Sequence, residues 1–140
     1  MLEDTPILRF DGGSRGNPGR AGCGFVILTS KSNDTPICYD YKYLGNNVTN
    51  NYAEYNGLIM GLEDVIKHNI KNIIIEGDSL LVINQLLGKW KVKSENLKSL
   101  YEKASTLLKE FDSYTLKHIP RSENKKADKL ANNAMNMSSY

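Results

Sequence analysis

Four of the 16 acidic residues in this 140-residue chain stand where surface acids are not usually found. Asp11 ends a short apolar segment, PILRFD, and a glycine-rich segment follows it. Asp78 comes soon after three consecutive isoleucines. Both patterns place an acid at the carboxyl end of a strand, where ligands of open α/β sheets bind. Two such acids on neighbouring strands repel each other unless a cation lies between them.

The other two acids, Glu54 and Asp128, lie beside apolar stripes that predict helices. At about 100° per residue, Glu54 falls next to Leu58 and Val65, and Asp128 falls next to a stripe rich in alanine. Half-buried acids require partners. A plainer alternative stays open: Glu54 and Asp128 interact with helix dipoles, and Asp78 caps a helix.

If the four acids converge at one edge of the sheet, the cluster offers only oxygen ligands. The chain has two histidines and two cysteines, and none stands at a spacing that supports a zinc ligand set here. Oxygen ligands favour the hard cations Mg²⁺ and Mn²⁺. Two such ions, ~4 Å apart, can activate a water and stabilise the leaving oxygen of a phosphoryl transfer.

Hydrophobic periodicity predicts the elements that position these acids. A glycine-rich loop is expected at residues 12–22, and Ser79 and Ser122 are expected helix caps. The first three strands form an antiparallel meander, whereas helical crossovers require parallel later strands. The fold class is therefore α/β, with a five-stranded mixed sheet flanked by helices. Strands are expected at residues 6–11, 22–30, 37–45, 71–77 and 114–119, and helices at 50–68, 80–87, 97–108 and 122–135.

Composition bounds the class of protein. With 40% hydrophobic and 24% charged residues, the chain is expected to form a single domain over residues 1–140. A net charge of +2 does not by itself imply nucleic-acid binding. Cys23 and Cys38 are too few for a disulfide framework, and whether they pair stays open. Glu3 and Asp4 argue against a secretory signal, and no apolar stretch approaches the ~20 residues of a membrane span, so a cytoplasmic protein is expected.

The sequence strongly resembles type 1 ribonuclease H over nearly the whole chain. Four segments carry the resemblance in the family's order: DGGSRGNPG from Asp11, TNNYAEYNGLIMGL from Thr49, IIIEGDS from Ile73 and HIPRSENKKADKLAN from His118. The resemblance implies a ribonuclease H-like fold and an endonuclease that hydrolyses the RNA strand of RNA–DNA hybrids. The products would carry 5′-phosphate and 3′-hydroxyl ends. The chain is too short after Trp90 for the longer basic protrusion of some relatives, so it resembles the short members.

The same resemblance implies catalytic roles. Asp11, Glu54, Asp78 and Asp128 correspond to the family's acidic quartet, which holds two Mg²⁺ ions, with Mn²⁺ as a substitute. Asp11 would bridge both metals, Asp78 and Asp128 would share the metal on the side of the nucleophile, and Glu54 would hold the other metal and contact a 2′-hydroxyl. His118, ten residues before Asp128, would aid proton transfer or product release, or is instead a structural residue.

Substrate contacts are implied for the segments around the acids. Glycine lets the backbone approach a ribose closely, and the TNN segment would bind a DNA phosphate and the minor-groove edge. Loop and N-cap roles remain open for the asparagines. The basic segment KWKVKSENLK suits a phosphate track, or its tryptophan instead covers the core. The predicted substrate-binding residues are Gly12, Gly13, Ser14, Asn17, Thr49, Asn50, Asn51, Trp90 and Lys91.

Leu80 departs from the family pattern, in which many relatives carry a glutamine that touches the RNA minor groove. Looser discrimination is therefore expected, with weak activity on double-stranded RNA, and the chain is expected to act as a monomer. One alternative is a catalytically silent module that only binds hybrid or double-stranded RNA. Another is a different nuclease of the superfamily, such as a 3′→5′ exonuclease or an integrase core. Such an exonuclease has Asp-x-Glu on its first strand, where this chain has Asp11-Gly12-Gly13.

Overall fold

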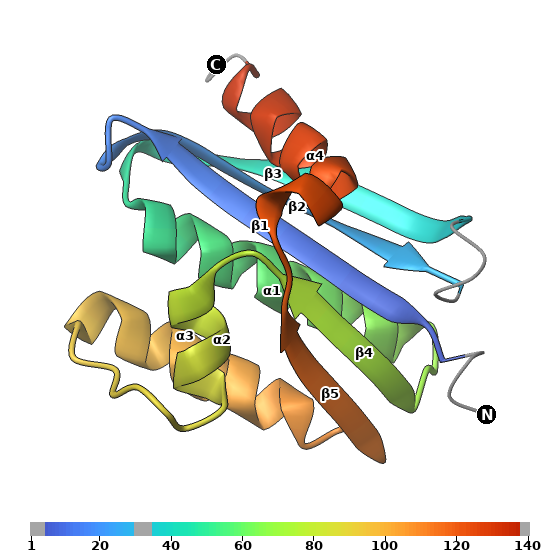
Figure 1. Ribbon diagram of the computed structural model, residues 1–140. Helices are drawn as coiled ribbons and strands as arrows, with labels where there is room; N and C mark the ends of the chain where they lie inside the picture. Colours follow the sequence, from blue (N-terminus) through green and yellow to red (C-terminus); the bar gives the residue numbers. More distant parts are fainter. Residues whose placement is uncertain (1–4, 30–34, 138–140) are drawn as a thin grey trace.

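The computed structural model describes residues 5–29 and 35–137 of the chain (Figure 1). Residue 30 of the second predicted strand, and Glu3 and Asp4, lie outside the described residues. The order of elements follows the predicted order. The elements are β1 (Ile7–Arg15), β2 (Gly19–Leu28), β3 (Pro36–Val48), α1 (Asn50–Lys67), β4 (Asn72–Gly77), α2 (Leu80–Leu86), α3 (Glu95–Leu108), β5 (Ser113–His118), the short 3₁₀ turn η2 (Arg121–Glu123) and α4 (Lys125–Met135).

The five strands form one mixed sheet in the order β3-β2-β1-β4-β5. β1 pairs antiparallel with β2, and β2 pairs antiparallel with β3, which is the predicted meander. β4 runs parallel to β1, and β5 runs parallel to β4, as the helical crossovers require. The predicted fold class is confirmed.

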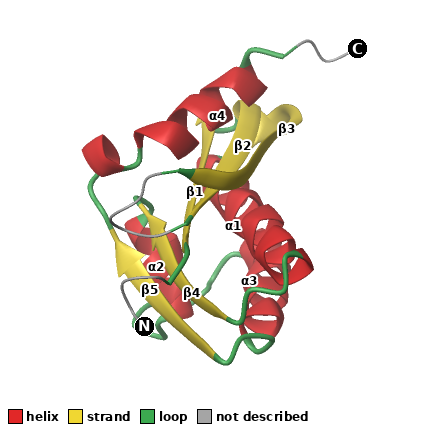
Figure 2. Ribbon diagram, turned by 90° about the vertical axis from the view of Figure 1, so that its right-hand side faces the viewer, coloured by secondary structure: helices red, strands yellow, loops and turns green. Residues whose placement is uncertain are grey.

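Helices cover both faces of the sheet (Figures 1 and 2). α1 packs against β1 and β2 on one face, with α3 behind it, and α4 packs against the same two strands on the other face. Since successive strand residues point to opposite faces, Leu8 lies in the larger core under α1, whereas Ile7 lies in the smaller core under α4. Within the described residues, no helix combines the length and the apolar character that crossing a bilayer demands.

The predicted glycine loop is wrong in its extent. β1 continues to Arg15 and β2 begins at Gly19, so only residues 16–18 form the turn. The glycines lie inside the strands because helices approach them closely. A Cβ on Gly12 would lie 2.3 Å from the carbonyl of Ala53 in α1, and a Cβ on Gly22 would lie 2.6 Å from the Cβ of Ala134 in α4. The glycine-rich segment is therefore a hairpin whose strands admit one helix on each face.

The start of the last helix differs from the prediction, whereas α1 begins at Asn50 as predicted. The last helix begins at Lys125 with Asn124 as its N-cap, not at Ser122, because η2 intervenes. Asn124 is fully buried, and its Nδ2 donates to the carbonyl of Phe10 at 2.9 Å, which ties the start of α4 to β1. At the start of α1, Thr49 is the cap and accepts from the amide of Tyr52 at 3.3 Å. The cap predicted at the start of α2, Ser79, is confirmed.

Candidate active site

Asp11, Glu54 and Asp78 lie together in the lining of a cleft of about 460 Å³. One carboxylate oxygen of each residue lies within 4.8 Å of the other two. Asp11 is in the middle of β1 and not at its end, which corrects the prediction. It nevertheless lies beside the end of β4, because the pairing of β1 with β4 stops at Phe10 and Gly77. Asp78 follows β4 directly, so the two acids share one edge of the parallel pair.

Glu54 reaches the same point from α1. Gly57 allows this approach, because a Cβ at that position would lie 2.5 Å from the carbonyl oxygen of Asp11. The Glu54 side chain is 5% exposed, and its Oε1 has no hydrogen-bond partner among the described residues. A buried carboxylate oxygen without a partner is costly, so the position favours a bound cation or a proton.

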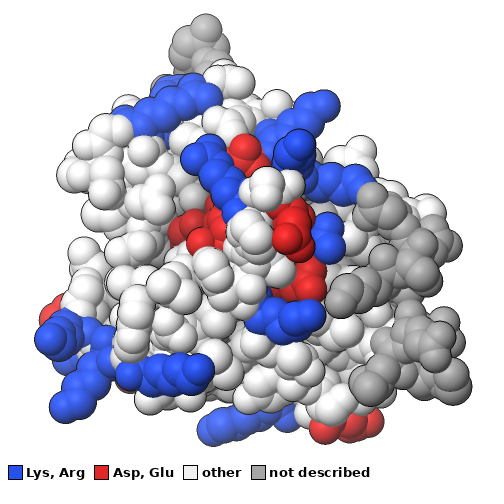
Figure 3. All heavy atoms as spheres, viewed as in Figure 1, with Lys and Arg blue, Asp and Glu red and all other residues white. Residues whose placement is uncertain are grey.

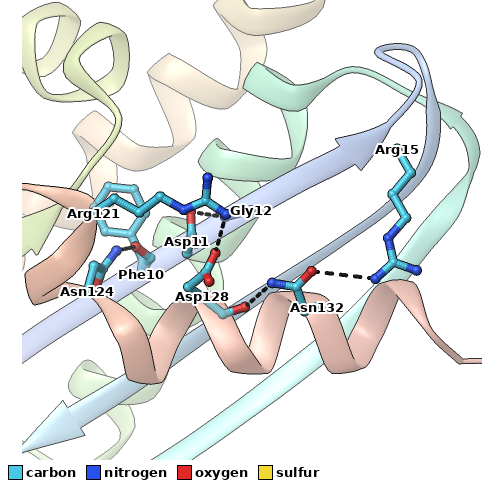
Figure 4. A network of polar contacts seen from close by, with 8 residues as sticks. All are labelled: Phe10, Asp11, Gly12, Arg15, Arg121, Asn124, Asp128 and Asn132. Atoms are coloured by element: carbon cyan, nitrogen blue, oxygen red, sulfur yellow. Dashed lines mark hydrogen bonds and ion pairs between the residues drawn. The ribbon is translucent and has the colours of Figure 1, made fainter.

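Asp128 enters the cleft from the first turn of α4. Its Oδ1 lies 3.3 Å from Nη2 of Arg121, an ion pair that Figure 4 shows in front of β1. Asn132 donates from Nδ2 to the backbone carbonyl of Asp128 at 3.0 Å, and Arg15 reaches the Oδ1 of Asn132 at 3.5 Å. This chain of contacts connects the tip of the β1–β2 hairpin with the acid on α4.

Electrostatics in the cleft favour protonated acids or a cation. Burial, the neighbouring Asp78 and a hydrogen bond with Asp128 raise the pKa of Asp11 to about 8. Burial and the charges of Asp11 and Asp78 raise the pKa of Glu54 well above its usual value. Burial also raises the pKa of Asp78, although Asp11, Arg121 and Asn124 oppose the shift. An oxygen-only donor set with one unpartnered buried oxygen fits a hard divalent cation.

Several of the predicted substrate-binding residues line the cleft: Gly12, Gly13, Ser14 and Asn50. Ser14 is already engaged, since its Oγ donates to the carbonyl of Val48 at 2.6 Å. His118 also lines the cleft: it ends β5, pairs with Gly77 and is exposed. Its ring is therefore accessible to solvent beside the acidic cluster.

Other predicted contacts lie away from the acids. Among the described residues, the cleft lining does not include Asn17, Thr49 or Asn51. Asn17 instead accepts from the backbone amide of Asn50 at 2.8 Å through its Oδ1, so it connects the hairpin turn with the start of α1. The loop role that stayed open for the asparagines therefore describes Asn17.

Trp90 and Lys91 lie in the connection between α2 and α3 and do not reach the cleft. Trp90 is 46% exposed, so it is not a buried core residue. Gln85 positions this connection, because its Nε2 donates to the carbonyl of Lys91 at 3.3 Å while its Oε1 accepts from Tyr55 at 2.6 Å. Figure 3 shows the molecule from the same side as Figure 1. Acidic side chains lie near the centre of this face, and lysine and arginine side chains lie around them.

Sequence reasoning missed Arg121 and Asn124. Arg121 forms an ion pair with Asp128. Asn124 lies at the start of α4, and its side chain hydrogen-bonds Asp78, which opposes the rise in the pKa of Asp78. Both residues stand inside the segment that carries the family resemblance, HIPRSENKKADKLAN. The signal was therefore present, but only the fold shows that these side chains point at the acids.

Comparisons with known proteins give consistent matches. The model of the family described as reverse transcriptase-like matches residues 9–134. The bifunctional protein Rv2228c of Mycobacterium tuberculosis is 43% identical over 129 residues, which cover 92% of this chain and 35% of that protein. Ribonuclease HI of Halobacterium salinarum is 40% identical over 126 residues, which cover 90% of this chain and 62% of that protein. The chain thus spans about a third of the first relative and somewhat less than two thirds of the second.

Solved structures agree over almost the full chain. The N-terminal RNase H domain of Rv2228c has a TM-score of 0.89 at 41% identity and covers 94% of this chain and 93% of its own. RNase H1 of Halobacterium salinarum has a TM-score of 0.87 at 37% identity, with 94% and 97% covered. LC11-RNase H1, isolated from compost and solved in complex with an RNA/DNA hybrid, has a TM-score of 0.85 at 37% identity, with 94% and 96% covered.

Proposed function

The chain belongs to the type 1 ribonuclease H family. We propose that it hydrolyses the RNA strand of RNA–DNA hybrids. The cleavage is endonucleolytic and leaves 5′-phosphate and 3′-hydroxyl ends. The convergence of Asp11, Glu54 and Asp78 within 4.8 Å of one another carries the proposal. The likeness to LC11-RNase H1, solved with an RNA/DNA hybrid, supports the choice of substrate.

The proposed cofactor is a pair of Mg²⁺ ions, for which Mn²⁺ can substitute. Asp11, Glu54, Asp78 and Asp128 would hold these ions, with Asp11 shared between them, Asp78 and Asp128 on the side of the attacking water, and Glu54 on the other side. When bound, the ions supply Lewis-acid stabilisation of the reacting phosphate and lower the pKa of the attacking water. The unpartnered, buried Oε1 of Glu54 supports this assignment, since a cation would satisfy it.

The chain's own residues orient the substrate in this proposal. Gly12 and Gly13 line the cleft and present backbone beside Glu54, where a ribose 2′-hydroxyl is sensed. Arg121, whose side chain is 77% exposed, lies 3.3 Å from Asp128 and can turn to a phosphate of the RNA strand. His118, exposed at the end of β5, assists proton transfer or the departure of the product.

Contacts at the start of α1 and in the connection between α2 and α3 supply affinity. Thr49, Asn50 and Asn51 lie at the start of α1, on the DNA-strand side of the proposed duplex. Lys91 adds positive charge along the connection between α2 and α3, and Trp90 beside it offers an aromatic ring that can stack on a sugar or base. Asn17 acts through Asn50, because it holds that residue's backbone amide at 2.8 Å.

The domain organisation, the oligomeric state, the compartment and the duplex selectivity of the enzyme are also part of the proposal. The chain forms one catalytic domain over residues 1–140 and acts as a monomer in the cytoplasm. Cys23 and Cys38 are free thiols, which suits a reducing compartment. Leu80, 47% exposed two residues after Asp78, cannot hydrogen-bond a base, so weak cleavage of double-stranded RNA is proposed as well.

An RNA–DNA hybrid labelled at the 5′ end of its RNA strand tests the function. We expect internal cleavage with Mg²⁺, no cleavage after EDTA, and product ends that a ligase joins without prior phosphorylation. Binding of the hybrid without any cleavage under Mg²⁺ or Mn²⁺ would contradict the proposal and identify a silent binding module instead.

A further inference from the structure

A second group of metal-ligating side chains lies away from the catalytic cleft, between β3 and the end of α1. It consists of Cys38 on β3, Asp64 in the last turns of α1, and His68, the C-cap of that helix. One ligand atom of each residue lies within 4.8 Å of the other two. Asp64 follows Glu54 by ten residues on the same helix, about 15 Å along its axis, so this β3–α1 cluster is separate from the catalytic acids.

The contacts inside the β3–α1 cluster are direct. The Sγ of Cys38 donates to Oδ2 of Asp64, and Nδ1 of His68 lies 3.8 Å from the same oxygen. The His68 ring is held in place, since its Nδ1 also lies 2.8 Å from the backbone carbonyl of Asp64. The Asp64 and His68 side chains are 21% and 38% exposed, so an ion can enter from solvent without opening the core.

The donor set decides the class of ion. Sulfur, imidazole nitrogen and carboxylate oxygen together suit Zn²⁺, whereas the oxygen-only catalytic cluster suits Mg²⁺. We propose that Cys38, Asp64 and His68 bind one Zn²⁺, with a water completing a tetrahedral site. Tetrahedral zinc bonds of about 2.0–2.3 Å place the ligand atoms roughly 3.4–3.7 Å apart. Without metal, Nδ1 of His68 carries the proton that it donates to the backbone carbonyl of Asp64, so zinc binding by Nδ1 breaks this hydrogen bond and moves the proton to Nε2.

Binding exchanges a proton for the metal. Burial and the hydrogen bond with Asp64 raise the pKa of Cys38 to about 12, so without metal the thiol keeps its proton. Formation of the zinc–sulfur bond releases that proton to solvent, and the lone pair of sulfur becomes a ligand. Zn²⁺ with one thiolate, one carboxylate and a neutral imidazole has no net charge, which limits the cost of binding at a half-buried site.

The structural consequence is a connection between an edge strand and a helix. β3 is one of the two edge strands of the sheet and pairs with β2, and α1 carries Glu54 near its other end. An ion that joins β3 to the end of α1 stabilises the folded chain in proportion to its occupancy. Zinc at this site is therefore structural, and hydrolysis in the cleft does not require it.

Co²⁺ is the probe that reports thiolate coordination directly. The titration uses the full chain with Asp11→Asn, which weakens binding at the catalytic acids. We expect one equivalent of tetrahedral Co²⁺ with a thiolate-to-cobalt charge-transfer band, displaced by one equivalent of Zn²⁺. Adding Cys38→Ala should abolish the charge-transfer band and weaken Zn²⁺ binding at least tenfold. Removing a residue that only supports a metal ligand already costs about tenfold or more, and Cys38 is proposed as a ligand itself.

Cys23→Ala is the matched control, because Cys23 is the other free cysteine and lies outside the β3–α1 cluster. It should keep the band and the increase in melting temperature on adding Zn²⁺, whereas Cys38→Ala and His68→Ala should lose both. Hydrolysis of hybrid under Mg²⁺ by Cys38→Ala should match the unmodified chain. A missing charge-transfer band in the cysteine-intact protein, or Zn²⁺ affinity unchanged in both Cys38→Ala and His68→Ala, overturns the proposal.

Discussion

Asp11 shows how a residue proposed to act in catalysis can lower the stability of the folded protein. It is 5% exposed, and two other carboxylates lie around it, so its ionised form is unfavourable in the folded protein without a cation. Its pKa rises from 3.8 to about 8 for that reason. An acid whose pKa is raised on folding contributes full stability below its unfolded pKa, and this contribution is lost as the pH rises through the folded value.

Replacing Asp11 should therefore stabilise the metal-free protein in a pH-dependent way. The amide side chain of the Asp11→Asn variant would keep an acceptor for the backbone N–H of Gly12, now 2.9 Å from the carboxylate, but it carries no charge. In EDTA, Asp11→Asn should melt at least about 3 °C above the unmodified chain at pH 9, and the difference should shrink towards pH 4. Thermal unfolding across this pH range is the measurement. A difference that stays constant with pH would show that ionisation of Asp11 is not responsible.

Among single residues, the acids could be predicted and their partners could not. Asp11 and Asp78 follow apolar strand patterns that are visible in the sequence. Arg121 and Asn124 stand in a turn with no periodicity, so their direction depends on how η2 and α4 leave β5. Cys38 and His68 are 30 residues apart in the chain and become neighbours only when β3 lies along α1.

At the scale of elements, the spacing between α4 and the sheet determines where Asp128 lies. A Cβ on Gly24 would lie 2.6 Å from the Cβ of Leu130 and 3.0 Å from the amide of Ala131, both in α4. Because Gly22 and Gly24 have no side chains on the face of β2 towards α4, the helix lies close enough to carry its acid into the cleft. Similar contacts at Gly12 and Gly22 explain why a segment that the sequence predicts to be a loop forms strands: glycine frequency alone does not separate a turn from a strand under a helix.

Gly24→Ala tests this spacing. The added methyl group should displace α4, lower the free energy of unfolding by about 1–3 kcal/mol and reduce hydrolysis well beyond the loss of folded protein. Cys23→Ala is the matched control, since it truncates the neighbouring residue of β2 on the face towards α1, where the Cys23 sulfur contacts Met60. It should cost stability with little effect on the rate of the folded enzyme. If Gly24→Ala and Cys23→Ala have equal stability and lose equal activity, the position of α4 is not critical for hydrolysis.

The connection between α2 and α3 is predicted to supply affinity without chemistry. Lys89, Lys91 and Lys93 are exposed and lie outside the catalytic cleft. Replacing all three with glutamine should raise KM, leave kcat nearly unchanged and lower the slope of log affinity against log salt by about 2 to 3. Lys103→Gln is the control, because this lysine pairs with Glu63 at 3.5 Å. A salt slope unchanged by the triple replacement would show that the connection faces away from the duplex.

At the scale of the whole molecule, the topology brings four acids to one edge of the sheet. They come from β1, α1, the end of β4 and α4. Alternation, helical stripes and crossover rules were sufficient to predict the mixed sheet and its helices. They were not sufficient to predict that Trp90 lies away from the cleft, because the course of an irregular connection depends on contacts such as that of Gln85 with Lys91. Element bounds differed most where glycine or a 3₁₀ turn replaced a regular pattern, as at Gly12 and Ser122.

Recognition of the duplex as a whole predicts a graded choice of substrate. If Glu54 and the backbone of Gly12 and Gly13 sense 2′-hydroxyls, one ribonucleotide in DNA should be cut at least about tenfold more slowly than a run of four or more, because most of these hydrogen bonds are lost. Leu80→Gln should increase the ratio of hybrid to double-stranded RNA cleavage in Mn²⁺. Matched duplexes with one, two, four and all ribonucleotides, plus an all-RNA duplex, give these rates. Equal rates on one ribonucleotide and on the full hybrid would contradict the sensing scheme.

In the proposed function, the carboxylates at this edge of the sheet hold the divalent metal with which the chain cuts the RNA strand of a hybrid. The most direct test labels the RNA strand and the DNA strand of one hybrid with different fluorophores and follows both under Mg²⁺. We predict that only the RNA strand is cleaved. Asp78→Asn should reduce that rate at least about 100-fold while circular dichroism and hybrid binding are retained, since loss of a metal ligand exceeds the effect of losing a supporting residue. Cleavage of the DNA strand, or near-normal activity of Asp78→Asn at saturating Mg²⁺, would contradict the account.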